Sequence, residues 1–124
     1  NIMKQLIFIS IILLALSSCQ KEKKLLEEIY DEPAYAIGTI NSSISGTFAV
    51  QYNYSFYVGS TKYKGNKKEG GLNPNNSSMI GCRYLVVYKI SEPEKNDLNY
   101  KYPIYTEQDF LDLLEEFKTN PPKP

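Results

Sequence analysis

The longest regular pattern of apolar and polar positions lies in the middle of the chain. Between residues 47 and 58, apolar side chains occupy every second position and polar or small residues mostly fill the positions between them. The apolar set is Phe48, Val50, Tyr52, Tyr54, Phe56 and Val58. A period of two predicts a long, half-buried β-strand. Gly59-Ser60 then forms a two-residue loop of the hairpin type, so Thr61–Lys64 is expected to pair back on this strand.

The same period of two predicts further strands on both sides. Tyr35–Ile40 is expected to form a first strand, and Leu98–Ile104 an edge strand. Arg83–Ile90 is apolar on both faces, which is typical of a central strand. Turn-forming residues dominate two of the connections, so Gly65–Ser78 is expected to be a long exposed loop and Ser91–Asn96 a turn.

Near its end the chain changes to a helical period. The apolar stripe at this spacing comprises Phe110, Leu113, Leu114 and Phe117. Thr106 precedes it as an N-cap, and Asp109 stands where a capping box needs an acceptor. We expect the stripe to pack on the sheet, with a partner-binding helix as the alternative. The predicted fold class is mainly β: a small antiparallel barrel or sandwich of about five strands with one C-terminal amphipathic helix.

The beginning of the chain has the pattern of an export signal. Met3-Lys4 precedes an apolar run over residues 6–16 that only Ser10 interrupts. The run is too short to cross a bilayer, so it predicts a signal peptide over residues 1–18. Leu16–Cys19 resembles the bacterial lipobox, in which the cysteine receives a diacylglyceryl group and becomes the mature N-terminus. We therefore expect a lipidated Cys19, with an ordinary secreted protein as the alternative.

The expected domain organisation follows from the lipidation site. Residues 19–33 are predicted to be a lipid-anchored tether, either a short helix or a flexible stalk, and residues 34–120 the β-domain with its helix. With Cys19 lipidated, Cys82 has no cysteine left to pair with inside the chain. It is expected to be a buried thiol.

Composition and charge exclude several classes of function. The 124 residues include 14 Lys and Arg, 14 Asp and Glu, and no His. Zero net charge argues against a nucleic-acid binder, because such proteins depend on an excess of cations. The absence of His removes the commonest general base and metal ligand, and no pair of carboxylates is predicted to face across a cleft. We expect no enzymatic activity, no cofactor and no metal site.

Tyrosine is the residue type most suited to binding, since the chain holds 11 of them. On the predicted hairpin and edge strand, Tyr57, Tyr63 and Tyr102 are expected to be exposed interface anchors. Lys62 and Lys64, next to them in the hairpin, would attract a partner of opposite charge. The alternative for these lysines is a charged edge that prevents aggregation.

Two groups of motifs resemble bacterial lipoproteins. The order Val58–Gly65, Tyr84–Tyr88 and Glu92-Pro93 is similar to an uncharacterised small β-domain that is common in lipoproteins of Bacteroidota. The start Cys19-Gln20-Lys21-Glu22 resembles the signal of surface-exported lipoproteins in these bacteria, although Lys23 replaces the usual second acid. The resemblance implies a lipid-anchored outer-membrane protein that faces the cell exterior, with the periplasmic face as the alternative. It supplies no catalytic residues.

Two functions fit these expectations. The first is a non-catalytic accessory subunit, anchored in outer-membrane lipid through Cys19 and bound to a larger outer-membrane protein. The second is a small surface module that binds a glycan or another ligand. A flat apolar patch of tyrosines would favour the first function, and an aromatic groove with converging Asn and Asp side chains the second.

Overall fold

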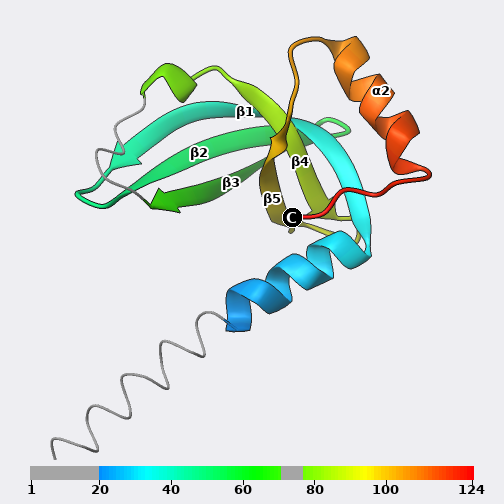
Figure 1. Cartoon of the computed structure of the whole chain (residues 1–124), viewed down its shortest axis with the longest axis horizontal. Coiled ribbons are helices and arrows are strands. Elements are labelled where there is room, and N and C mark those ends of the chain that lie inside the picture. Colours follow the sequence, from blue (N-terminus) through cyan, green and yellow to red (C-terminus); the bar gives the residue numbers. More distant parts are fainter. Residues whose placement is uncertain (1–19, 71–76) are drawn as a thin grey trace, which may run out of the picture.

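The computed structural model describes residues 20–70 and 77–124, and within them it forms one five-stranded antiparallel sheet (Figure 1). The strands are β1 (Pro33–Ser45), β2 (Ala49–Val58), β3 (Thr61–Gly70), β4 (Arg83–Lys89) and β5 (Glu92–Pro103). The helices are an N-terminal helix over residues 20–31, the short 3₁₀ helix η1 (Ser77–Met79) and α2 (Glu107–Phe117). The predicted fold class is confirmed. The predicted signal peptide and Cys19 lie outside the described residues.

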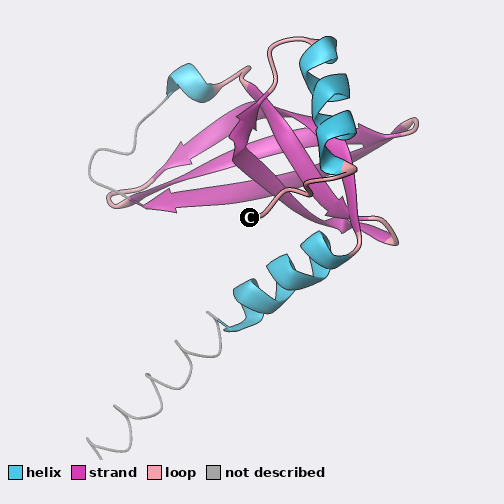
Figure 2. Cartoon of the chain, turned by 45° about the vertical axis from the view of Figure 1, so that its right-hand side comes forward, coloured by secondary structure: helices cyan, strands magenta, loops and turns pink. Residues whose placement is uncertain are grey.

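Strand β1 is the centre of the sheet, whose order is β3-β2-β1-β4-β5. Residues 33–39 of β1 pair with β4, whereas residues 39–45 pair with β2. The two hairpins β2–β3 and β4–β5 are therefore offset along β1. The sheet curls into a half-barrel (Figure 2), and its two outer strands approach each other closely enough for Lys67 of β3 to bind Asp97 of β5.

The inside of the curl holds an aromatic-rich core. Its buried members are Ala36, Ile40, Val50, Tyr52, Tyr54, Phe56, Val86 and Leu98. Phe56 stacks between Tyr63 and Tyr88, with ring centroids 5.8 and 5.6 Å away. Four of these residues are alternate positions of β2, so the period of two seen in the sequence is the inner face of this strand.

A second core lies on the outer face of β1, β4 and β5, under the helices. Its buried members are Ile29, Leu85, Val87, Ile104 and Phe117. Strand β4 faces both cores, because Leu85 and Val87 point to the helices and Val86 points inward, and none of the three is exposed. The central position predicted from its two apolar faces is confirmed.

The N-terminal segment is a helix in the described residues rather than a flexible stalk. Ile29 of this helix is fully buried in the outer core, and Tyr30 packs beside it. The packed unit therefore includes residues before position 34. No helix in the described ranges is long and apolar enough to cross a membrane.

Three local predictions are wrong. Gly65–Ser78 is not one long loop, because β3 continues to Gly70. The turn predicted over Ser91–Asn96 is shorter, since β5 already begins at Glu92. Both segments lack an apolar period but are held by backbone pairing with a neighbouring strand. Phe48, expected on the buried face, is 70% exposed because β2 begins only at Ala49.

Candidate functional site

Part of the outer face of the sheet is not covered by the helices. The outer core includes no residue of β2 or β3, so the outward side chains of these strands and of the second half of β1 lie outside the helices and, apart from the buried Ser55, reach solvent. We call this surface the polar sheet face. It comprises Thr39, Asn41, Ser42, Ile44, Gln51, Asn53, Ser55, Tyr57, Lys62, Lys64, Asn66 and Lys68, of which Ile44 is an exposed apolar residue.

Register places the side chains of this face in ordered rows. In the β2–β3 pair, the directly opposite outward residues are Tyr57 and Lys62, Ser55 and Lys64, Asn53 and Asn66, and Gln51 and Lys68. Opposite side chains on one face of an antiparallel pair are close enough to contact the same ligand. At about 3.3 Å per residue, the rows extend over roughly 20 Å of strand.

An irregularity in β1 completes the face. The register between β1 and β2 shifts between Ile40 and Ser42, which leaves Asn41 as an extra residue. The Asn41 side chain donates a hydrogen bond to Ser55 Oγ at 2.8 Å. The bulge thus aims an amide group at the centre of the polar sheet face.

Hydrogen bonds between side chains fix the amides in place. Asn53 Nδ2 donates to Ser42 Oγ at 3.0 Å, and Gln51 Nε2 donates to Asn53 Oδ1 at 2.9 Å. Asn66 has no side-chain hydrogen bond within the described part of the chain, so its amide is available to a ligand. The arrangement offers both donors and acceptors at fixed positions.

The centre of the polar sheet face is hollowed. The hollow has a volume of about 390 Å³ and is lined by Asn41, Ser42, Asn53, Tyr54, Lys64, Gly65 and Asn66. Tyr54 points into the inner core and Gly65 has no side chain, so these two residues contribute main chain to its floor. The other five residues that line the hollow have polar side chains.

All charged side chains of the polar sheet face are positive. Lys62, Lys64 and Lys68 are exposed, and none of their ammonium groups makes an ion pair or a hydrogen bond among the described residues. None of the twelve residues of this face is acidic. The face therefore suits ligands that are rich in hydroxyl groups or negatively charged.

The structure brings together three of the five predicted interface residues. Tyr57, with 61% of its surface exposed, lies on the polar sheet face with Lys62 and Lys64. The expectation that Tyr63 and Tyr102 are fully exposed is wrong, since both are half-buried. Tyr63 is opposite Phe56 and so points into the inner core, whereas Tyr102 packs on Phe117 with centroids 5.3 Å apart.

Sequence reasoning missed the amides of this face. Gln51, Asn53 and Ser55 already alternate with apolar residues in the sequence, and this signal could have identified them as an outward row. The bulge at Asn41 has no sequence signal, and Asn66 was placed in a loop. The interface role proposed for the tyrosines and lysines stays a prediction.

A second surface surrounds Tyr105, which is 78% exposed at the start of the segment leading into α2. Two hollows of about 310 and 330 Å³ adjoin it. Arg83 on one side donates a hydrogen bond to the Tyr105 carbonyl oxygen at 2.6 Å. Cys82 lines the first hollow and is half-buried rather than buried, with its Sγ 3.6 Å from the Ser78 carbonyl oxygen.

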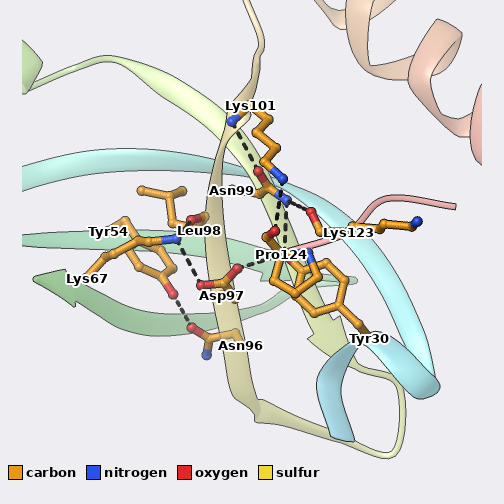
Figure 3. Close-up of polar contacts among 10 residues, drawn as sticks. All are labelled: Tyr30, Tyr54, Lys67, Asn96, Asp97, Leu98, Asn99, Lys101, Lys123 and Pro124. Atoms are coloured by element: carbon orange, nitrogen blue, oxygen red, sulfur yellow. Dashed lines mark hydrogen bonds and ion pairs between the residues drawn. The ribbon is translucent and has the colours of Figure 1, made fainter. Parts of the chain in front are cut away.

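A polar network at the seam between β3 and β5 is structural (Figure 3). Asp97 accepts hydrogen bonds from Tyr30 Oη at 2.7 Å and from Lys67 Nζ at 3.1 Å. Asn99 donates to Tyr30 Oη and to the Lys123 carbonyl oxygen, both at 3.0 Å. Burial, and then the Asp97 charge, raises the pKa of the Tyr30 phenol well above its ordinary value of 10. The donors and acceptors of this network hydrogen-bond one another, so none of the groups just described is free to bind a ligand.

Metal chemistry has no support in the described residues, because they contain no group of three His, Cys, Asp or Glu side chains that could hold a metal ion. Comparisons with known proteins do not assign the chain to a family. No family model, no curated protein and no solved structure matches the chain.

Proposed function

We propose that this protein is a non-catalytic, lipid-anchored outer-membrane protein that binds an extracellular glycan on its polar sheet face. The observation that carries the proposal is the set of amide, hydroxyl and ammonium groups held in rows around the 390 Å³ hollow. Paired amides match vicinal hydroxyl groups of a sugar ring, since each amide both donates and accepts. Tyr57, exposed at one end of the rows, provides an aromatic surface on which a sugar ring can stack.

The composition of the face supports a glycan more than a protein partner. Protein interfaces are enriched in aromatic residues, Met and Arg at their centre, and depleted of Lys and Ser. The polar sheet face has the opposite composition, with Asn53, Asn66 and Lys64 at its centre. Its large aromatic residue, Tyr57, lies at an end.

The anchor would hold the domain near the membrane. Cys19 directly precedes the N-terminal helix in the sequence, and the helix packs on the domain through Ile29. A lipid at Cys19 would therefore be joined to the domain by a helix that is itself docked. We place the protein on the cell exterior, with the periplasmic face as the alternative location.

A second candidate function is the accessory subunit of a larger outer-membrane complex. The exposure of Tyr105 at the 310 Å³ hollow favours it, because this side chain lies outside the polar sheet face. An exposed tyrosine next to a hollow is a suitable interface anchor. On this alternative, Tyr105 takes the role first expected of Tyr63 and Tyr102.

Glycan binding is tested with the full-length protein in detergent on an array of polysaccharides. We expect retention of at least one polysaccharide, and a loss of about tenfold or more in affinity for N53A/N66A, because buried hydrogen-bonding groups of the ligand lose their partners. The matched control is Asn120→Ala, since Asn120 is exposed after α2 and its side chain makes no hydrogen bond in the described part of the chain. An array with no retained polysaccharide, or equal affinities of N53A/N66A and wild type, would overturn the proposal.

Anchoring is tested separately by Cys19→Ala. We expect this variant to accumulate as an unprocessed precursor and to lose labelling by a fatty-acid analogue, because only the thiol can form the thioether to the lipid. Protease added to intact cells should degrade the wild-type protein if it faces the exterior. Undiminished labelling of the variant contradicts the lipid anchor, and complete protection from protease contradicts the exterior location.

A further inference from the structure

We propose that the ligand of the polar sheet face is an acidic polysaccharide whose carboxylates are bound by Lys62, Lys64 and Lys68. This inference rests on the proposed glycan-binding function and adds the charge and the shape of the ligand. It is carried by the placement of the three lysines on one face of one strand, without any acidic neighbour on that face.

The positive charge of this face comes from the positions of the charged residues and does not need an excess of cations in the whole chain. The whole chain has as many acidic as basic side chains, 14 of each. The residues opposite the three lysines are nevertheless uncharged: Tyr57, Ser55 and Gln51. An unpaired ammonium group attracts an anion without first losing a protein partner, so the face is poised for a negatively charged ligand.

Protection of a sheet edge does not explain these lysines. Gatekeeper lysines act by blocking strand pairing along an exposed edge. The middle of the β3 edge is already covered by contacts to β5, in which Lys67 binds Asp97 and the Leu98 carbonyl oxygen. The Asn96 side chain also donates to the Lys64 carbonyl oxygen at 3.4 Å. Lys67 therefore serves this edge contact, whereas the side chains of Lys62, Lys64 and Lys68 lie on the outward face of the strand.

The spacing of the lysines fits an extended polymer along β3. Alternate residues of a strand are about 6.6 Å apart, so Lys62 and Lys64 are neighbours and Lys68 lies roughly 13 Å beyond Lys64. The interval between Lys64 and Lys68 holds Asn53, Asn66 and the hollow. A linear chain of acidic sugars would place carboxylates at the lysines and hydroxyl groups at the amides between them.

The experiment measures binding of the full-length protein in detergent to polygalacturonate, alginate and hyaluronan, each paired with its carboxyl-reduced or methyl-esterified form. We expect at least one acidic polymer to bind about tenfold or more tightly than its neutralised form. Binding should weaken as salt rises, because exposed charges are screened. Replacing Lys62, Lys64 and Lys68 together by Gln should abolish the preference for the acidic form.

The matched control variant is K23Q/K24Q/K123Q, which removes the same amount of charge from exposed lysines outside the polar sheet face that make no ion pair within the described residues. It should retain wild-type affinity within about twofold, as long-range charge effects are small at physiological salt. Loss of binding in both variants would show a dependence on net charge alone and overturn the inference. Failure of all three acidic polymers, or equal binding of charged and neutralised forms, would also overturn it.

Two further outcomes separate this inference from the proposed function. If the polysaccharide array yields a neutral glycan that binds through Asn53 and Asn66, glycan binding is upheld and the acidic ligand is rejected. If double-stranded DNA binds as tightly as the acidic polymers, with the same dependence on the three lysines, the face makes a generic contact with polyanions. That result would reject specific recognition of a polysaccharide.

Discussion

At the scale of single residues, Gly65 shows how the inner core and the polar sheet face constrain each other. A Cβ atom at this position would overlap the phenol ring of Tyr54 and the side-chain oxygen of Asn96. The Tyr54 hydroxyl donates a hydrogen bond to the same Asn96 oxygen. The missing side chain of Gly65 therefore lets Tyr54 pass under β3 and reach β5.

Replacing Gly65 by Ala should destabilise the protein by about 1–3 kcal/mol, the usual effect of adding a methyl group to a filled core. Gly70→Ala is the matched control on the same strand, since its nearest contact would be the Phe48 carbonyl oxygen at an ordinary 3.8 Å. Urea unfolding followed by circular dichroism measures both changes. If the two variants are equally stable, Tyr54 does not occupy the space under Gly65.

At the scale of elements, α2 begins with a complete capping box. Thr106 Oγ1 accepts a hydrogen bond from the Asp109 backbone N–H, while Asp109 Oδ2 accepts from the N–H groups of Thr106 and Tyr105 at 2.9 and 3.0 Å. The backbone N–H group of Thr106, followed by that of Tyr105, lowers the pKa of Asp109 below its ordinary value of 3.8. The Thr106 N-cap predicted from sequence is confirmed.

The lowered pKa of Asp109 predicts that the stability contributed by the cap depends on pH. A carboxyl group with a depressed pKa in the folded state stabilises the protein above its unfolded pKa, and this contribution is lost as pH falls through the folded pKa. The Asp109 contribution should therefore be complete at neutral pH, begin to fall near the ordinary pKa of 3.8, and be lost as pH falls through the lower pKa of the folded state. Asp109→Asn should lower the melting temperature at pH 7 and have a much smaller effect near pH 2. An equal effect at both pH values would contradict the role of the carboxylate.

At the C-terminal end of α2, packing on the sheet predicts that substitutions of the buried side chain lower the free energy of unfolding. Phe117 is buried against Tyr35 and Tyr102, with ring centroids 4.9 and 5.3 Å away. Phe117→Ala should destabilise the protein by about 3–5 kcal/mol. Leu111→Ala, on the exposed side of the same helix, should change the stability by less than about 0.5 kcal/mol. Comparable urea midpoints for the two variants would show that α2 is not docked.

The elements that could be predicted from sequence are those with a strong apolar period. The inner face of β2, the two-sided β4 and the stripe of α2 each bury residues at regular intervals, so their sequence and their structure agree. The second half of β3 and the start of β5 are polar and are held by backbone pairing, which leaves no periodic signal. Tyr57, Lys62 and Lys64 were found because hairpin register follows from a two-residue turn, whereas Asn41 depends on a bulge.

At the scale of the whole molecule, the half-barrel is closed by side chains instead of a backbone ladder. Asp97 is the common acceptor of this closure, with its side chain 12% exposed. It binds Lys67 on β3 across the seam and Tyr30 on the N-terminal helix. One carboxylate thus joins the helix that follows the proposed lipid anchor to the strand that carries the lysines of the polar sheet face.

Replacing Asp97 by Ala should therefore loosen two distant elements together. The variant leaves the Lys67 ammonium group without its ion-pair partner and removes the acceptor of the Tyr30 hydroxyl, so we expect a loss of about 1.5–3 kcal/mol. Hydrogen exchange should rise both in the helix over residues 20–31 and in β3. Glu115→Gln is the control, because it breaks only the exposed pair between Glu115 and Lys118. Faster exchange confined to β3 would show that the contacts of the helix other than Asp97 are enough to hold it, and that the helix and the seam are energetically independent.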